Sequence, residues 1–343
     1  MGYYAIDTFS NLTSYKLARD IETISVPICA TFGILGNLLS FIVLVSSSLL
    51  KSTTCMYMLA IAVFDTIVLI NAVLTLMDLK NREVVVCNLL SFLFYFSIHS
   101  GALLIVAMTF ERYIVVKYPL KAAGWVTKTR TKRIILTVGV LSFLINIPQG
   151  TMRKIQFIAE KGEMGCFYEG ESNVFFFTKI YPWIDAIVYC FIPVSSLFIL
   201  NILIIKNLKN SKLNLNDCTN RQSAINKQQK QITIMLILVS VAFLVLTGPI
   251  GAMLVIQRYL WIPKTPGDLA DYRLIHAVID NMMLSNHALN FIIYVVSGQK
   301  FRQQLKKIVC RRHFKNGIVR RERQVYVSQL DGMHCERGSI SNL

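Results

Sequence analysis

The chain has 343 residues, of which 54% are hydrophobic and only 16% are charged. Soluble domains carry about a quarter charged residues, so this composition leaves too little polar surface to enclose a soluble core of this size. The sequence therefore excludes an ordinary soluble protein and indicates that the lipid bilayer is its solvent. The net charge of +17 does not indicate a nucleic acid, because no nucleic-acid-binding motif accompanies it. An enzyme is not expected either, since there is no nucleophile, phosphate-loop or metal-ligand signature.

Seven apolar stretches come close to the length that a helix needs to cross a bilayer, about 20 residues. The fourth is the shortest. They predict an all-α membrane protein, a seven-transmembrane helix bundle over residues 24–298. The stretches cover residues 24–45, 56–77, 89–115, 134–148, 181–205, 232–256 and 274–296.

The basic residues indicate how the chain crosses the membrane. Of the 36 Lys and Arg residues, 25 fall on the side opposite the amino terminus. Short cytoplasmic loops collect Lys and Arg, so we expect a multi-pass plasma-membrane protein with residues 1–23 extracellular and the carboxyl terminus cytoplasmic. The cationic inner face would meet anionic membrane lipids and a cytosolic partner. Asn11 opens an N-glycosylation sequon on the extracellular side, although such a sequon also arises by chance.

Several short motifs lie within or beside these spans, one set after another along the chain. They are Gly36-Asn37, Leu59-Ala60 with Asp65, Cys87, Glu111-Arg112-Tyr113, Pro193, Phe243 with Pro249, and Asn290-Phe291-Ile292-Ile293-Tyr294. With this set the chain resembles the rhodopsin-like (class A) G-protein-coupled receptors over about residues 24–310. The resemblance implies a receptor that activates a heterotrimeric G protein. It also implies coupling and activation roles for Glu111, Arg112, Tyr113, Phe243, Pro249, Asn290 and Tyr294.

Two positions depart from the family pattern. Phe291 stands where the seventh span usually has a proline, so that helix keeps one more backbone hydrogen bond and is less prone to kink. Thr247 stands where the sixth span often has a Trp, whereas Pro249 is retained and is expected to kink this helix and act as a hinge.

Asp65 lies near the middle of the second span, where a charged side chain costs about 2.5–3.5 kcal/mol on insertion scales. We therefore expect it to face polar partners inside the bundle. In the family this residue can hold an allosteric sodium ion, but Gly101 replaces a Ser that often helps to bind it. A protonated or water-bridged Asp65 is the alternative, and no other cofactor and no metal site are expected. The expected polar partners are Asn37, Asn286 and Asn290.

The cysteines divide by the side of the membrane on which they fall. Cys87 and Cys166 both lie in extracellular segments, where the oxidising environment permits a disulfide between them. Residues 299–310 form an amphipathic stretch that resembles the family's eighth helix on the inner leaflet, and Cys310 at its end is a candidate for palmitoylation. The tail 311–343 is polar and is expected to be disordered, with serines that a receptor kinase could phosphorylate for arrestin.

Two absences narrow the class of ligand. Phe94 replaces the Asp of amine receptors, and Leu284 replaces the Lys that binds retinal in opsins. The carboxylate of Asp280 would suit an Arg or an amidated cationic peptide end, unless it pairs with Arg258. We expect a neuropeptide, because the chain also resembles invertebrate neuropeptide (FMRFamide-like) receptors; a lipid or other small molecule is the alternative. The candidate ligand-binding residues are Phe94, Tyr95, His99, Asp185, Gln257 and Asp280.

Overall fold

The computed structural model describes residues 12–45, 52–79, 83–158, 163–212, 220–259 and 264–308. Asn11, Cys310 and the tail 311–343 lie outside these ranges, and the side chain of Gln257 is not described. The chain divides into two compact units, Met1–Gly298 and Gln299–Leu343. In the second unit residues 299–308 are helical, within the range predicted for the amphipathic helix.

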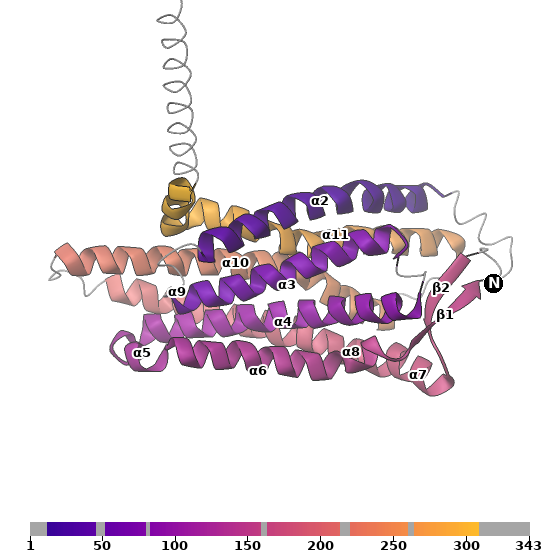
Figure 1. Ribbon diagram of the computed structural model, residues 1–343, viewed down its shortest axis with the longest axis horizontal. Coiled ribbons are helices and arrows are strands. Elements are labelled where there is room, and N and C mark those ends of the chain that lie inside the picture. Colours follow the sequence, from indigo (N-terminus) through magenta and orange to yellow (C-terminus); the bar gives the residue numbers. More distant parts are fainter. Residues whose placement is uncertain are drawn as a thin grey trace, which may run out of the picture. The chain divides into compact units, whose positions relative to one another are not determined.

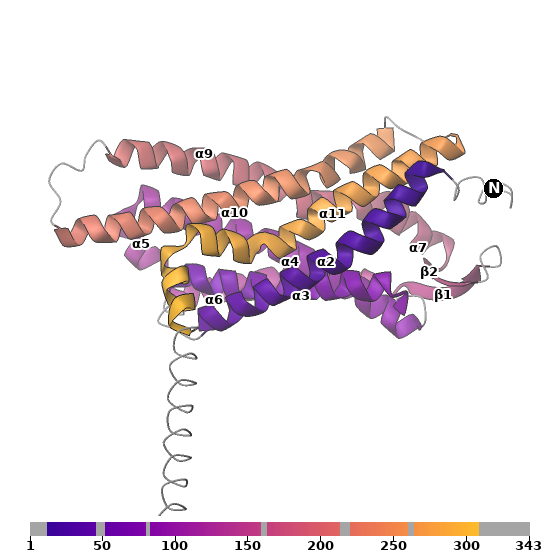
Figure 2. The same ribbon diagram turned by 90° about the horizontal axis from the view of Figure 1, so that it is seen from above.

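The first unit is a helical bundle (Figures 1 and 2). Its described residues contain seven long helical segments in the order that the apolar stretches predict. They are α2 (Thr13–Val45), α3 (Thr53–Leu76), α4 (Val84–Lys117), α6 (Lys128–Asn146), the consecutive α8 (Tyr181–Asp185), η5 (Ala186–Phe191) and α9 (Ile192–Lys212), α10 (Asn220–Tyr259) and α11 (Pro266–Ser297). Shorter elements are η3 (Ile147–Gly150), α5 (Pro119–Trp125), α7 (Glu171–Phe175) and η4 (Phe176–Ile180).

The helix ends differ from the apolar limits in places. α2 begins at Thr13, well before the predicted residue 24, so part of the expected amino-terminal segment is helical. α6 begins at Lys128, on a turn capped by the Thr127 side chain, which accepts from the backbone N–H of Arg130. Hydropathy locates the part of a helix that faces lipid, whereas capping residues determine where the helix itself begins.

Six helices of the described residues are long and apolar enough to cross a membrane, and α11 is not among them. With 32 residues α11 is long enough, but its polar residues lower its hydropathy. Asn286, His287 and Asn290 are buried in the bundle, so these polar groups do not face outward. The outward faces are apolar instead: Phe32 and Leu136 are 73% and 68% exposed. Polar residues inside and apolar residues outside are the distribution that a bilayer requires.

Helix α4 is central, since it contacts α3, α6, α9 and α10. On one side of the bundle α2 packs against both α3 and α11, as both views show. Gly33 permits this close packing: a Cβ atom built there would lie 2.6 Å from the Leu69 side chain and 2.9 Å from the Ala288 Cα atom. The absence of a side chain at this position brings three helices together.

A two-stranded antiparallel sheet follows η3 and precedes α7 in the chain; the all-α prediction did not include it. It pairs β1 (Arg153–Ile158) with β2 (Glu163–Tyr168), and Figure 1 shows it beyond one end of the helices. The predicted disulfide between Cys87 and Cys166 is confirmed, with a Cα–Cα distance of 6.2 Å, and it joins β2 to the first turn of α4. Asn88 and the backbone of Arg153 exchange two hydrogen bonds of 3.1 Å, which also hold β1 to α4. We call this end of the bundle the disulfide end.

Candidate functional site

Two charged side chains, Glu111 and Arg112, are buried near the carboxyl end of α4, at the end of the bundle opposite the disulfide end. The Arg112 guanidinium donates to the Thr54 hydroxyl on α3. Glu111 accepts from Thr53 on α3 and, at 3.1 Å, from Thr131 on α6. Arg112 and Glu111 are only 5% and 7% exposed, so another protein can reach Arg112 only after these helices separate.

A second polar cluster surrounds Asp65 in the middle of the bundle. The Asp65 Oδ1 atom lies 2.7 Å from Nδ1 of His287, and its Oδ2 atom accepts from Nδ2 of Asn290, also at 2.7 Å. Asn37 donates at 3.1 Å to the backbone carbonyl of His287 rather than to Asp65. Asn286 is buried nearby on α11. These contacts tie α3 to α11 through one carboxylate.

A cavity of about 640 Å³ lies between α2, α3, α4, α8, η5, α10 and α11. Such a volume suits a drug-sized ligand or one end of a larger one. Its lining is mainly apolar and aromatic, and it includes Phe94, Tyr95 and Tyr189. Phe94 and Tyr95 stand within about three helical turns of Cys87, so the cavity belongs to the disulfide end.

Three carboxylates line this cavity: Glu22 on α2, Asp185 at the end of α8 and Asp280 on α11. Glu22 forms an ion pair of 3.1 Å with Arg273. Asp280 is exposed to the cavity, and the described residues provide it with no ion pair. The side chain of Arg258 is not described, so the expected alternative pairing of Asp280 stays a prediction.

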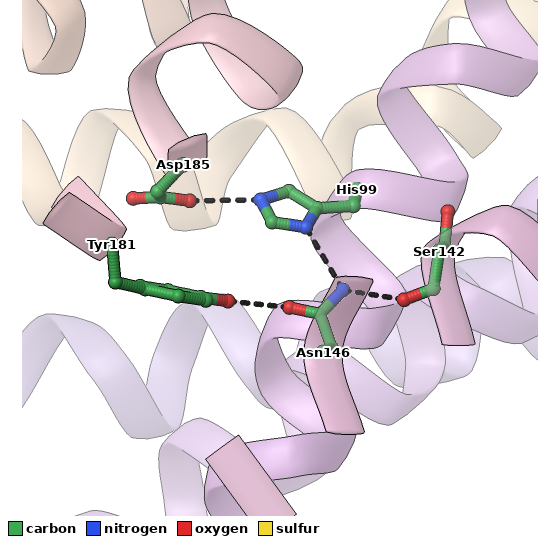
Figure 3. A network of polar contacts seen from close by, with 5 residues as sticks. All are labelled: His99, Ser142, Asn146, Tyr181 and Asp185. Atoms are coloured by element: carbon green, nitrogen blue, oxygen red, sulfur yellow. Dashed lines mark hydrogen bonds and ion pairs between the residues drawn. The ribbon is translucent and has the colours of Figure 1, made fainter. Parts of the chain in front are cut away.

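A network of hydrogen bonds stands behind Asp185 (Figure 3). The His99 Nε2 atom lies 2.9 Å from the Asp185 Oδ1 atom, and the other ring nitrogen, Nδ1, lies 3.0 Å from Nδ2 of Asn146. Asn146 Nδ2 also donates at 2.7 Å to the backbone carbonyl of Ser142, and its Oδ1 accepts at 2.5 Å from the Tyr181 hydroxyl. His99 and Asn146 are fully buried. The network therefore fixes the orientation of Asp185 from α4, α6 and α8.

The same network indicates which nitrogen of His99 donates a hydrogen bond. A backbone carbonyl only accepts, so the Asn146 atom next to the Ser142 carbonyl must be the amide nitrogen. That nitrogen has no lone pair to offer, and its second hydrogen points at the Nδ1 atom of His99, which must accept. The proton of His99 then lies on Nε2 and is donated to Asp185. His99 is thus the donor to Asp185 in this arrangement, and Asn146 determines the direction of that hydrogen bond.

A family model described as 7 transmembrane receptor (rhodopsin family) matches residues 36–294. The chain belongs to this receptor family. It is 23% identical to a probable G-protein coupled receptor of Caenorhabditis elegans, over 97% of the chain and 80% of that receptor. It is 26% identical to the human thyrotropin-releasing hormone receptor, over 84% of the chain and 77% of that receptor. It is 23% identical to human neuromedin-U receptor 1, over 83% of the chain and 73% of that receptor.

The receptor brings four of the six candidate ligand-binding residues to one cavity: Phe94, Tyr95, Asp185 and Asp280. His99 is not part of the lining, because it lies behind Asp185 and holds that carboxylate. His99 was expected to face a ligand, but in the structure it positions the Asp185 carboxylate instead.

The residues predicted for coupling and activation are spread along the receptor. Phe243 and Tyr294 are buried on α10 and α11. Helix α10 continues through Pro249. Tyr113 accepts a hydrogen bond of 2.7 Å from Lys117 near the end of α4. Their roles in activation stay predictions.

Several residues of these sites were not predicted, among them Glu22, Asn146, Tyr181 and His287. Of these four only His287 had a usable signal, because it precedes Asn290 by three residues and so lies on the same helix face. The other three reach the cavity or the network from separate elements, and no spacing in the sequence joins them.

Proposed function

We propose that this receptor lies in the plasma membrane with its disulfide end outside the cell, binds a peptide that carries a cationic group, and activates a heterotrimeric G protein. The proposal depends above all on the pair of carboxylates, Asp185 and Asp280, in a mainly apolar cavity. The predominance of basic residues on the opposite side supports this orientation.

The charge of the cavity favours a cationic ligand group. Asp185 is held by a hydrogen bond to His99, and Asp280 adds a second carboxylate to the same cavity. In a partly dry cavity a charge-assisted hydrogen bond to an Arg, Lys or amino group is shorter and stronger than one between neutral groups. A neutral ligand would instead leave both carboxylates without a compensating charge, which is costly.

A peptide is favoured over a lipid by two observations. Relatives named for thyrotropin-releasing hormone and neuromedin-U support a peptide ligand. The sheet β1–β2, held by the disulfide and by Asn88, also provides a fixed rim at the same end as the cavity. The aromatic residues Phe94, Tyr95 and Tyr189 favour the second candidate, a receptor for a lipid or other small molecule.

G-protein coupling would take place at the opposite end. Arg112 is buried against Thr54, so this arrangement is closed to a partner protein. Ligand binding must therefore favour a second arrangement in which α3, α4 and α6 separate around Arg112. The basic segments 116–133 and 206–231 would then add attraction for an acidic partner surface.

The test is nucleotide exchange on G proteins in membranes of cells that express the receptor. Amidated neuropeptides that contain Arg or Lys are compared with the same peptides carrying citrulline or norleucine at those positions, and with panels of amines and lipids. We expect a saturable response to a cationic peptide, a much weaker one to its neutral counterpart, and none in Arg112→Ala at equal surface expression. A response to lipids alone would support the second candidate, and a normal response in Arg112→Ala would overturn the proposed coupling.

A further inference from the structure

The polar cluster around Asp65 carries an inference that goes beyond the proposed function. Family resemblance implies a sodium ion beside this carboxylate. Sodium is a hard cation, and such ions are bound by several oxygen ligands. The fit therefore depends on which atoms surround Asp65.

The contacts of Asp65 are with nitrogen atoms. Its Oδ1 and Oδ2 atoms lie 2.7 Å from His287 Nδ1 and Asn290 Nδ2. The amide of Asn290 presents N–H groups, which repel a cation. The Asp65 and His287 side chains are each only 4% exposed, so water does not readily replace them. Among the described residues no group of three or more acidic, His or Cys side chains is arranged to hold a metal.

Residue 101 on α4, the third span, provides no side-chain oxygen that could bind a sodium ion. Gly101 has no side chain, and a Cβ atom built on it would have no neighbour within 4 Å. The space for a Ser exists, but the hydroxyl that often helps to bind sodium in the family does not.

His287 and Asn290 occupy both oxygen atoms of Asp65. A buried carboxylate is costly unless it is hydrogen-bonded, and these two side chains meet that need without a cation. We propose that they take the place of the sodium ion, so that the receptor has no sodium site at Asp65.

The test needs no ligand. The receptor purified in detergent is unfolded thermally in about 0.3 M NaCl and in the same concentration of choline chloride, which keeps ionic strength constant. We expect equal Tm values for the wild type. We expect the double variant His287→Ser with Gly101→Ser to gain roughly 2–4 °C in sodium only, the shift for a ligand present at a few times its dissociation constant.

Two comparisons assign the effect to His287. The single variant Gly101→Ser, which keeps His287, should not respond to sodium, although it has the added hydroxyl. A sodium-specific rise in the wild-type Tm would overturn the proposal whether or not the variants fold. A folded double variant that ignores sodium would overturn the role given to His287.

Discussion

The Nε2 atom of His99 lies 2.9 Å from the Oδ1 atom of Asp185, and Asn146 behind the ring determines that His99 donates this hydrogen bond. His99 thereby fixes the orientation of the Asp185 carboxylate, which lines the cavity. These two residues are 86 positions apart in the sequence. Their pairing explains how a buried histidine can serve a binding site that it does not touch.

Replacing Asp185 by Asn should weaken the response to a cationic peptide by about 10- to 100-fold, since a hydrogen bond to a charged group contributes about 1.5–3 kcal/mol. The concentration of peptide that gives half-maximal nucleotide exchange measures this change. Asp20→Asn is the matched control, because Asp20 is an exposed acid on α2 outside the lining of the cavity. Equal shifts in the two variants would show that general surface charge, and not Asp185, attracts the ligand.

Replacing Asn146 by Leu should destabilise the receptor. The change removes the hydrogen bonds that the Asn146 side chain makes to the Nδ1 atom of His99, the backbone carbonyl of Ser142 and the Tyr181 hydroxyl. An unsatisfied buried polar group costs about 1–3 kcal/mol, so the expected loss is at least that amount, seen as a lower Tm in detergent. Tyr181→Phe removes one bond of the same network and should cost less. If the two variants lose the same stability, the amide of Asn146 does not organise the network.

Much of the fold could be predicted from the sequence, because the length and hydropathy of an apolar stretch indicate a membrane-spanning helix. All seven predicted spans are helical, and the disulfide partners Cys87 and Cys166 are those that the side of the membrane indicated. The sheet β1–β2 was not predicted. It depends on tertiary support: Asn88 of α4 holds the backbone of Arg153.

The candidate sites were less predictable than the fold. Asp65, Asp185 and Asp280 stand out in a sequence because an acid in an apolar span needs an explanation. Their partners stand out less, because a buried His or Asn gains its role from a neighbour on another helix. His99 was therefore expected to face a ligand, whereas it holds Asp185 from behind.

Replacing Thr54 by Val should raise ligand-independent nucleotide exchange. The Thr54 hydroxyl accepts a hydrogen bond from Arg112 in the closed arrangement, and Val has a similar shape without the acceptor. A hydrogen bond to a charged group contributes about 1.5–3 kcal/mol, so basal exchange should rise by about 10-fold or more, up to the level of full activation. Thr66→Val is the matched control on the same helix, because the Thr66 hydroxyl donates only to the carbonyl of Ala62. Unchanged basal exchange in Thr54→Val would mean that this bond does not keep the receptor closed.

Two glycine-to-alanine changes should have opposite effects on stability. In a helix interior Ala is favoured over Gly by about 0.5–1 kcal/mol, so Gly139→Ala on α6, where a built Cβ has no neighbour within 4 Å, should raise the Tm slightly. At Gly33 the same Cβ would lie 2.9 Å from the Cα atom of Ala288, which is backbone and cannot rotate away.

The helices α2 and α11 must then move apart at Gly33, and overpacking of this kind costs about 1–3 kcal/mol. The gain in helix propensity does not offset this cost, so Gly33→Ala should lower the Tm in detergent while Gly139→Ala does not. Because Asn37 lies one turn along α2 and donates to the His287 carbonyl, the displacement should also loosen the support of Asp65. A Tm for Gly33→Ala equal to or above that of Gly139→Ala would contradict the close approach of α2 and α11.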